Sequence, residues 1–122
     1  MDYNKSLLSS FKYALEGVWH ALRYNRNLRI AFFLALLVGL LGLFFQVTSL
    51  EMVILIITIL LVILSEMINT SLEEIVNLIT SEHKKEAKIA KDVAAGMVLV
   101  ATIGSVIVGT FIFAPHVLKL FY

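Results

Sequence analysis

Four polar side chains recur at helical spacing within a part of the chain that is otherwise strongly apolar. Glu66 follows the apolar run 52–65, and Asn69, Glu73 and Asn77 lie three, seven and eleven residues further on. At ~100° per helical residue, all three return to within about 60° of Glu66. One helix is therefore expected to carry a polar stripe from inside a lipid bilayer out to its surface.

The two carboxylates Glu66 and Glu73 suit different steps of a transfer reaction. A carboxylate at membrane depth is costly to keep, so Glu66 is a candidate functional residue. Desolvation disfavours the charged form, which suits a general base that takes a proton from a hydroxyl. Glu73 lies two turns nearer the bilayer surface, where a carboxylate can hold Mg²⁺ against phosphate oxygens. The alternative is that Glu66 is a buried carboxyl paired across an oligomer interface, with no chemistry.

A second charged pair, Lys91 and Asp92, precedes the third apolar segment. A lysine there can bind phosphate, and an aspartate near a helix N-terminus interacts favourably with the helix dipole. The same pair is also typical of a snorkelling lysine followed by an N-cap. The chain has no cysteine and its three histidines are scattered, so neither thiolate chemistry nor a histidine metal site is expected.

The composition places these residues in an integral membrane protein. The chain has 122 residues, 60% of them hydrophobic and 16% charged, and its mean hydropathy is +0.93. A soluble domain of this size cannot bury so much apolar surface. We predict an all-α membrane protein forming a single domain over 1–122, with membrane helices at 28–47, 52–79 and 93–114. The apolar spans within them, roughly 28–47, 52–72 and 93–114, each have close to the ~20 residues that a crossing needs. A tight turn at 46–51 and a cytoplasmic loop at 80–92 connect them, and Pro115 is expected to stop the third.

Residues 6–27 have an amphipathic pattern in which apolar side chains recur every three or four residues. This predicts an N-terminal surface helix in the membrane interface, with Trp19 and Tyr13 at headgroup level. The alternative is a soluble helix packed on the cytoplasmic loop.

Positive charge is concentrated in two segments of the chain. One precedes the first membrane helix and the other lies between the second and third; the residues are Lys5, Lys12, Arg23, Arg26, Arg29, Lys84, Lys85, Lys88 and Lys91. The positive-inside rule places both segments, and hence the N-terminus, in the cytoplasm. The net charge of +1 does not indicate a nucleic-acid partner.

Three membrane helices are too few to enclose an intramembrane carboxylate, so an oligomer is expected. Small side chains in the third helix, Ala101, Ser105 and Gly109, recur at intervals of four and would allow close helix approach in lipid.

Two stretches of the chain match a known signature. Residues 65–77 (SEMINTSLEEIVN) and 90–96 (AKDVAAG) closely resemble that of the small prokaryotic diacylglycerol kinase family, which includes the undecaprenol kinases. The resemblance extends through residues 14–19 (ALEGVW) and Arg26-Asn27 into nearly the whole chain. It implies an ATP-dependent lipid kinase in the bacterial inner (plasma) membrane, active as a homotrimer whose sites are shared between neighbouring subunits.

The same resemblance implies roles for particular residues. Glu66 is similar in position to the family's catalytic base, and the lipid acceptor site is implied at Glu66, Asn69 and Ala95. Glu73 matches a ligand of the Mg²⁺ on the ATP phosphates. Nucleotide contacts are implied at Tyr13, Glu73, Asn77, Glu82, His83, Lys84, Lys91 and Asp92.

Two positions depart from the family pattern. Asn25 stands where the family has a second metal-ligating glutamate, and Asn77 where it has an aspartate. An asparagine oxygen can ligate Mg²⁺ but adds no negative charge, so Asn25 stays a candidate metal ligand of weaker affinity, unless Glu16 or Glu74 helps. On this view Asn25→Glu should lower the Mg²⁺ requirement.

The predicted acceptor is a membrane lipid alcohol, undecaprenol before diacylglycerol, because residues 16–19 and 69–70 are more similar to the undecaprenol kinase branch. Two alternatives stay open. An intramembrane glutamate in a chain of this size also suits a small proton-coupled transporter. The second alternative is a member of the kinase family with impaired catalysis, since Asn25 and Asn77 replace carboxylates.

Overall fold

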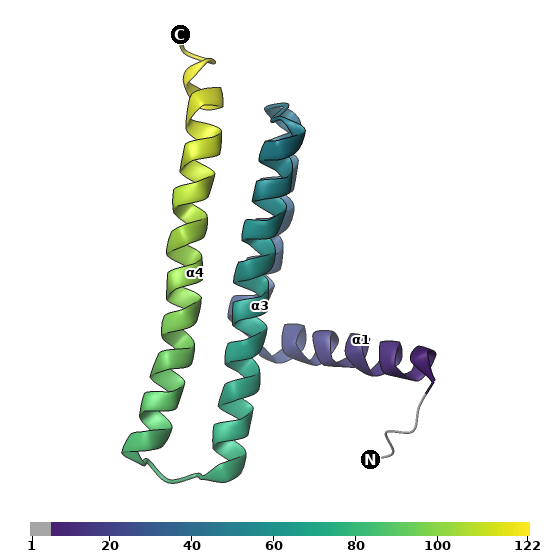
Figure 1. Ribbon diagram of the computed structural model, residues 1–122, viewed down its shortest axis with the longest axis vertical. Helices are drawn as coiled ribbons and strands as arrows, with labels where there is room; N and C mark the ends of the chain where they lie inside the picture. Colours follow the sequence, from purple (N-terminus) through teal and green to yellow (C-terminus); the bar gives the residue numbers. More distant parts are fainter. Residues whose placement is uncertain (1–5) are drawn as a thin grey trace.

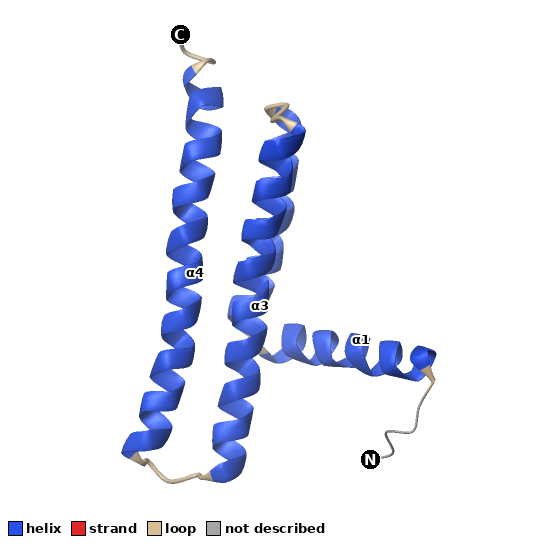
Figure 2. Ribbon diagram, in the orientation of Figure 1, coloured by secondary structure: helices blue, strands red, loops and turns tan. Residues whose placement is uncertain are grey.

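The computed structural model describes residues 6–122 and is helical almost throughout that range (Figures 1 and 2). The helices are α1 (Leu7–Tyr24), α2 (Arg26–Phe44), α3 (Ser49–Ile79) and α4 (Lys85–Leu118). Within the described range, α2, α3 and α4 are long and apolar enough to cross a membrane. The predicted all-α membrane fold is therefore confirmed. Lys5, one of the cations counted above, lies outside the described residues.

Side-chain caps fix where α2 and α3 begin. Asn25 Oδ1 accepts a hydrogen bond from the Leu28 N–H (3.1 Å) at the start of α2. At α3 the Thr48 hydroxyl accepts from the Glu51 N–H (3.1 Å), and the Glu51 carboxylate accepts from the Thr48 N–H (2.9 Å). This reciprocal capping box satisfies N–H groups that the first helical turn leaves unpaired.

Some boundaries differ from those predicted. The predicted loop at 80–92 is wrong beyond residue 84, because α4 begins at Lys85. The charged segment 85–92 is rich in strong helix formers, and its charges pair along the helix, as Lys88 Nζ does with Asp92 Oδ2 (2.6 Å). Pro115 lies inside α4 rather than beyond it. A membrane helix tolerates a proline where its surroundings satisfy the freed backbone groups.

The helices differ in length in a way that matters for the membrane. At 1.5 Å per residue, the 19 residues of α2 span about 28 Å, the 31 of α3 about 46 Å and the 34 of α4 about 51 Å. Only α2 therefore matches the ~30 Å hydrocarbon core closely, and α3 and α4 must extend beyond it.

The helices meet in a simple order. α3 packs against both α2 and α4, whereas α1 packs against α2 and leads away from the other helices (Figure 1). A small cluster of Ala21, Leu28 and Ile63 joins α1, α2 and α3 at this corner. Arg29 closes the C-terminal end of α1, since its guanidinium donates to the carbonyl oxygens of Leu22 (2.9 Å) and Arg23 (2.7 Å).

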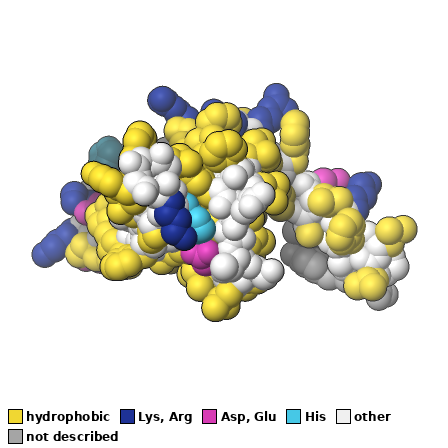
Figure 3. Space-filling model, turned by 90° about the horizontal axis from the view of Figure 1, so that it is seen from above, with side chains coloured by type: hydrophobic (Ala, Val, Ile, Leu, Met, Phe, Trp, Pro, Cys, Tyr) yellow, Lys and Arg dark blue, Asp and Glu magenta, His cyan; other side chains and the backbone are white. Residues whose placement is uncertain are grey.

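At the opposite end, the turn between α2 and α3 brings the two helices close together. A Cβ at Gly42 would lie 2.7 Å from Met52 Cε. His116 of α4 reaches the same end, where its Nε2 lies 3.4 Å from Glu51 Oε1. Seen from this end, hydrophobic side chains cover most of the visible surface (Figure 3), as lipid-facing helices require.

Candidate active site

Glu66 is buried where α3 passes the N-terminus of α2. The residue is only 6% exposed, and Ser65 beside it is 5% exposed. The Asn25 amide donates to the Thr70 hydroxyl, and the Thr70 hydroxyl donates to the Glu66 carbonyl oxygen (3.0 Å). The start of α2 is therefore level with the first turn of α3 after Glu66.

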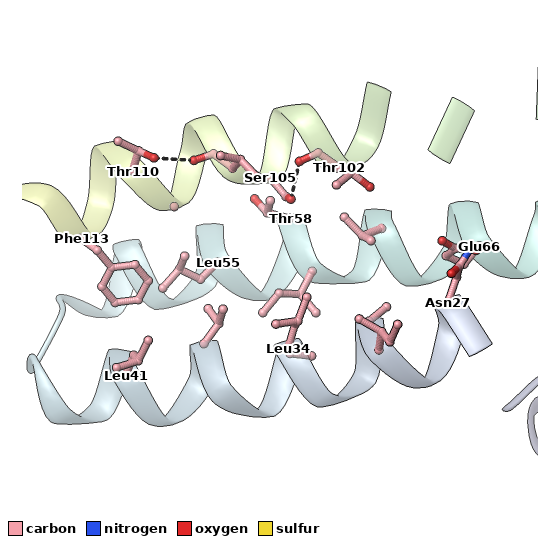
Figure 4. A pocket seen from close by; sticks show the side chains of 18 residues that line it. Asn27, Leu34, Leu41, Leu55, Thr58, Glu66, Thr102, Ser105, Thr110 and Phe113 are labelled. Atoms are coloured by element: carbon pink, nitrogen blue, oxygen red, sulfur yellow. Dashed lines mark hydrogen bonds between the residues drawn. The ribbon is translucent and has the colours of Figure 1, made fainter. Parts of the chain in front are cut away.

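Glu66 closes one end of a groove between α2, α3 and α4. The groove has a volume of about 610 Å³, with Glu66 and Asn27 at one end and Leu41 and Phe113 toward the other (Figure 4). Aliphatic side chains of α2 and α3, including Leu34 and Leu55, line its length.

Four hydroxyl groups also line the groove, and three of them bond within their own helix. Thr58 donates to the Ile54 carbonyl oxygen (2.7 Å), and Ser105 donates to that of Thr102 (2.7 Å). Thr110 is bonded to its own helix in the same way. A molecule in the groove would therefore find donors and acceptors for a hydroxyl chiefly at Glu66, Asn27 and Thr102, and a mostly apolar wall elsewhere.

The predicted polar stripe continues from Glu66 along α3. Asn69 Nδ2 donates to Glu73 Oε1 (3.3 Å), and Asn69 Oδ1 is buried without a hydrogen-bond partner. The Glu73 carboxylate is exposed. Within residues 6–122, no cluster of three or more acidic, histidine or cysteine side chains could hold a metal ion. Glu73 still fits Mg²⁺, because this ion is typically held by one or two carboxylates together with substrate phosphates.

A second cavity, of about 600 Å³, lies where α3 connects to α4. It collects six of the residues for which a nucleotide role is implied: Asn77, Glu82, His83, Lys84, Lys91 and Asp92. Lys91 Nζ donates to Asn77 Oδ1 (2.7 Å), which links α4 to α3 across the cavity. Lysines gathered beside exposed backbone are suited to binding phosphate groups.

The interpretation of Asp92 as an N-cap is wrong. Lys84 is the N-cap of α4, and Asp92 lies in the helix two turns later, where it pairs with Lys88. The sequence interpretation failed because the charged segment was assigned to a loop.

Five of the predicted residues line neither cavity. Two of them, Asn69 and Glu73, belong to the polar stripe on α3 described above. Tyr13 is half-exposed on α1, which leads away from α3, and Ala95 is exposed on α4. Asn25 is close to Glu66, but its side chain caps α2 and bonds Thr70.

Sequence reasoning assigned no role to Asn27, Thr70 or Lys88, all of which have partners or positions in the site. Thr70 lies four residues after Glu66, so helical spacing alone could have identified it. Asn27 needs the packing of α2 on α3, which the sequence does not show.

The chain is similar in sequence to a known protein family and to several of its members. Residues 12–113 match the prokaryotic diacylglycerol kinase family. The chain is 40% identical over 116 residues to a diacylglycerol kinase of Synechocystis, covering 94% of this chain and 66% of the relative. It is 37% identical over 106 residues to an undecaprenol kinase of Bacillus subtilis, covering 87% and 86%. A diacylglycerol kinase of Haemophilus influenzae is 32% identical over 95 residues, covering 78% and 80%.

The helices and these matches together define a multi-pass membrane lipid kinase. The chain belongs to the prokaryotic diacylglycerol kinase family. It spans about two thirds of the length of the Synechocystis relative. Membership of this family decides between the function classes left open by the sequence, in favour of a kinase over a transporter.

Proposed function

We propose that this protein transfers the γ-phosphoryl group of ATP to the hydroxyl of a membrane lipid alcohol, with Glu66 as general base. The observation that carries the proposal is the position of Glu66, buried at the junction between an apolar groove and a polar stripe that leads to a lysine-lined cavity. A lipid tail fits the groove and a nucleotide fits the cavity. Their reacting groups would then meet on the face of α3 that carries Glu66 and Glu73.

The length of α2 supports a position of this junction near the membrane surface. Because α2 is about as long as the hydrocarbon core is thick, its two ends mark the two boundaries. Asn25 precedes α2 and bonds Thr70, so Glu66 would lie about one turn inside the boundary. The end of α3 and the start of α4 would stand in water, where ATP arrives. Arg23, Arg26 and the lysines of 84–91 lie at this end, which supports a cytoplasmic orientation in the inner membrane.

The reaction then needs little beyond positioning and charge stabilisation. The Glu66 carboxylate takes the proton of the acceptor hydroxyl as its oxygen forms a bond to the γ-phosphorus. The bond from the γ-phosphorus to the β,γ-bridging oxygen breaks, and ADP leaves. Lys91 stabilises phosphate charge from the cavity side. Glu73 would hold Mg²⁺, which neutralises charge on the phosphate oxygens.

For the acceptor we propose undecaprenol first and diacylglycerol second. Relatives of both names match this chain at similar identity. The support for undecaprenol is the similarity of residues 16–19 and 69–70 to that branch. Incorporation of phosphate into the two lipids, measured side by side at equal mole fraction in one detergent, decides between them.

We further propose a homotrimer with sites shared between subunits. Tyr13 supports this, because α1 carries it away from the α3 of its own chain (Figure 1). A nucleotide contact by Tyr13 would then be made to a neighbouring subunit. If so, mixed oligomers of Glu66→Gln and Tyr13→Ala chains should recover activity that neither variant has alone.

The proposed function is tested by Glu66→Gln, which keeps the side-chain shape but removes the base. General-base catalysis contributes at least about 100-fold, so kcat for phosphate incorporation into lipid should fall by that factor or more, with ATP binding unchanged. Glu86→Gln, an exposed carboxylate in the first turn of α4, is the matched control. Retention of more than about a tenth of kcat by Glu66→Gln would exclude the base role.

A further inference from the structure

Asn25 is the only residue between α1 and α2, and it uses both polar atoms of its side chain. Its backbone is extended, with φ −115° and ψ 105°. The amide oxygen accepts from the Leu28 N–H (3.1 Å) and so caps α2. The amide nitrogen donates to the Thr70 hydroxyl on α3. One side chain therefore fixes the start of α2 against the helix that carries Glu66.

Thr70 links Asn25 to Glu66 by hydrogen bonds. Its hydroxyl accepts from Asn25 and donates to the Glu66 carbonyl oxygen (3.0 Å), one turn back along α3. The hydrogen bonds thus form a short chain from the N-terminus of α2 to the backbone of Glu66.

We infer that Asn25 is a positioning residue for Glu66 and not a metal ligand. The inference rests on the proposed function, since it assigns Asn25 a role in orienting the proposed base. The reason is chemical: an asparagine amide is both acceptor and donor, and this position uses each. A glutamate or aspartate at 25 could supply the acceptor for the helix cap but no donor for Thr70. It would also place a second negative charge beside Glu66.

This inference reverses the expectation drawn from the sequence for Asn25→Glu. If Asn25 were a weakened metal ligand, the glutamate would lower the Mg²⁺ concentration needed for half-maximal activity. If Asn25 positions Glu66, the glutamate removes the donor and disturbs the base. In that case kcat falls and the half-saturating Mg²⁺ concentration is not lowered.

The test compares Asn25→Glu, Asn25→Asp, Thr70→Val and Thr70→Ser in the full-length protein. Misplacing a catalytic group by about 1 Å can lower the rate about 100-fold, so we expect kcat to fall about 10- to 100-fold in the first three. KM for ATP should change less than about twofold, and Thr70→Ser, which keeps the hydroxyl, should recover most of the lost rate. Ser71→Ala, an exposed hydroxyl on the next residue of α3, is the control.

Two further measurements do not depend on turnover. Mn²⁺ binding to the protein with a non-hydrolysable ATP analogue, followed by electron paramagnetic resonance, should be equal in wild type and Asn25→Glu. Unfolding of the Asn25→Asp and Thr70→Val single and double variants should show a coupling energy between the two sites. Tighter Mn²⁺ binding or a lower Mg²⁺ requirement in Asn25→Glu overturns the inference. So does a kcat for Thr70→Val equal to that of Ser71→Ala.

The two proposals can fail separately. If Glu66→Gln is inactive and Thr70→Val is fully active, the assignment of Glu66 as the base is supported and the positioning role of Asn25 is refuted. An active Glu66→Gln would remove the base itself, whatever the Asn25 variants do.

Discussion

Leu28→Ala tests whether the corner between α1, α2 and α3 is a packed junction. Leu28 is 0% exposed, and within residues 6–122 it is the large side chain buried most completely. It contacts a cluster that includes Ala21 of α1 and Ile63 of α3. The corner adjoins Asn25 and Glu66, so its stability bears on the geometry of the site.

The magnitude follows from the three carbon atoms that the substitution removes. At about 0.8 kcal/mol per buried CH₂, the transfer contribution would be about 2.4 kcal/mol in a water-facing core. Leu→Ala substitutions in such cores cost about 2 to 5 kcal/mol because a cavity also remains. Between helices in lipid, the hydrophobic transfer contribution is absent, because lipid tails are as apolar as leucine. The loss of van der Waals packing around the cavity remains. We therefore expect the free energy of unfolding to fall by about 1 to 2 kcal/mol.

The measurement is reversible unfolding in mixed micelles, followed by helix content. A change of about 1 to 2 kcal/mol corresponds to about a 5- to 30-fold change in the unfolding equilibrium constant. Leu36→Ala is the control, since Leu36 is 64% exposed on the same helix. Its effect should stay within about 0.5 kcal/mol, as for most surface substitutions.

Equal destabilisation by Leu28→Ala and Leu36→Ala would refute the reasoning. It would mean that α1 does not pack on α2 and α3 in the membrane as it does here. In that case the packing of this corner would not hold Asn25 in place between α1 and α2.

Two other substitutions test the cavity and the turn. Lys91→Met removes the contact with Asn77 and the charge proposed to bind phosphate, so KM for ATP in a steady-state kinase assay should rise several-fold while the KM for lipid stays constant. Gly42→Leu adds a whole side chain where a Cβ already meets Met52 Cε. The end of the Met52 side chain can move, but the rest of the leucine should still lower the free energy of unfolding by about 1 to 3 kcal/mol. Gly39→Leu, where a Cβ meets no atom within 4 Å, should not, and equal effects at the two glycines would show that the approach is not tight.

The sequence by itself determined the class of fold and the helix that carries the proposed chemistry. Long apolar runs must be helical in lipid, because every backbone polar group has to be satisfied within the segment. Helical periodicity also placed Glu66, Asn69, Glu73 and Asn77 on one face of α3, since it depends only on local geometry.

Boundaries in charged segments were less well predicted. Residues 85–92 read as a loop because of their charge, yet they form the first two turns of α4. Charge density alone does not separate a solvated loop from a helix whose charges pair along its exposed face.

Only the tertiary structure decided which helices meet and which side chains they bring together. Asn25 and Thr70 are 45 residues apart, and their bond exists because α2 starts level with that turn of α3. The groove at Glu66 likewise needs three helices at once. Periodicity assigns a face to each helix but no partner to that face. In lipid the partner is chosen by close packing and a few hydrogen bonds, because burial of apolar surface no longer distinguishes one neighbour from another.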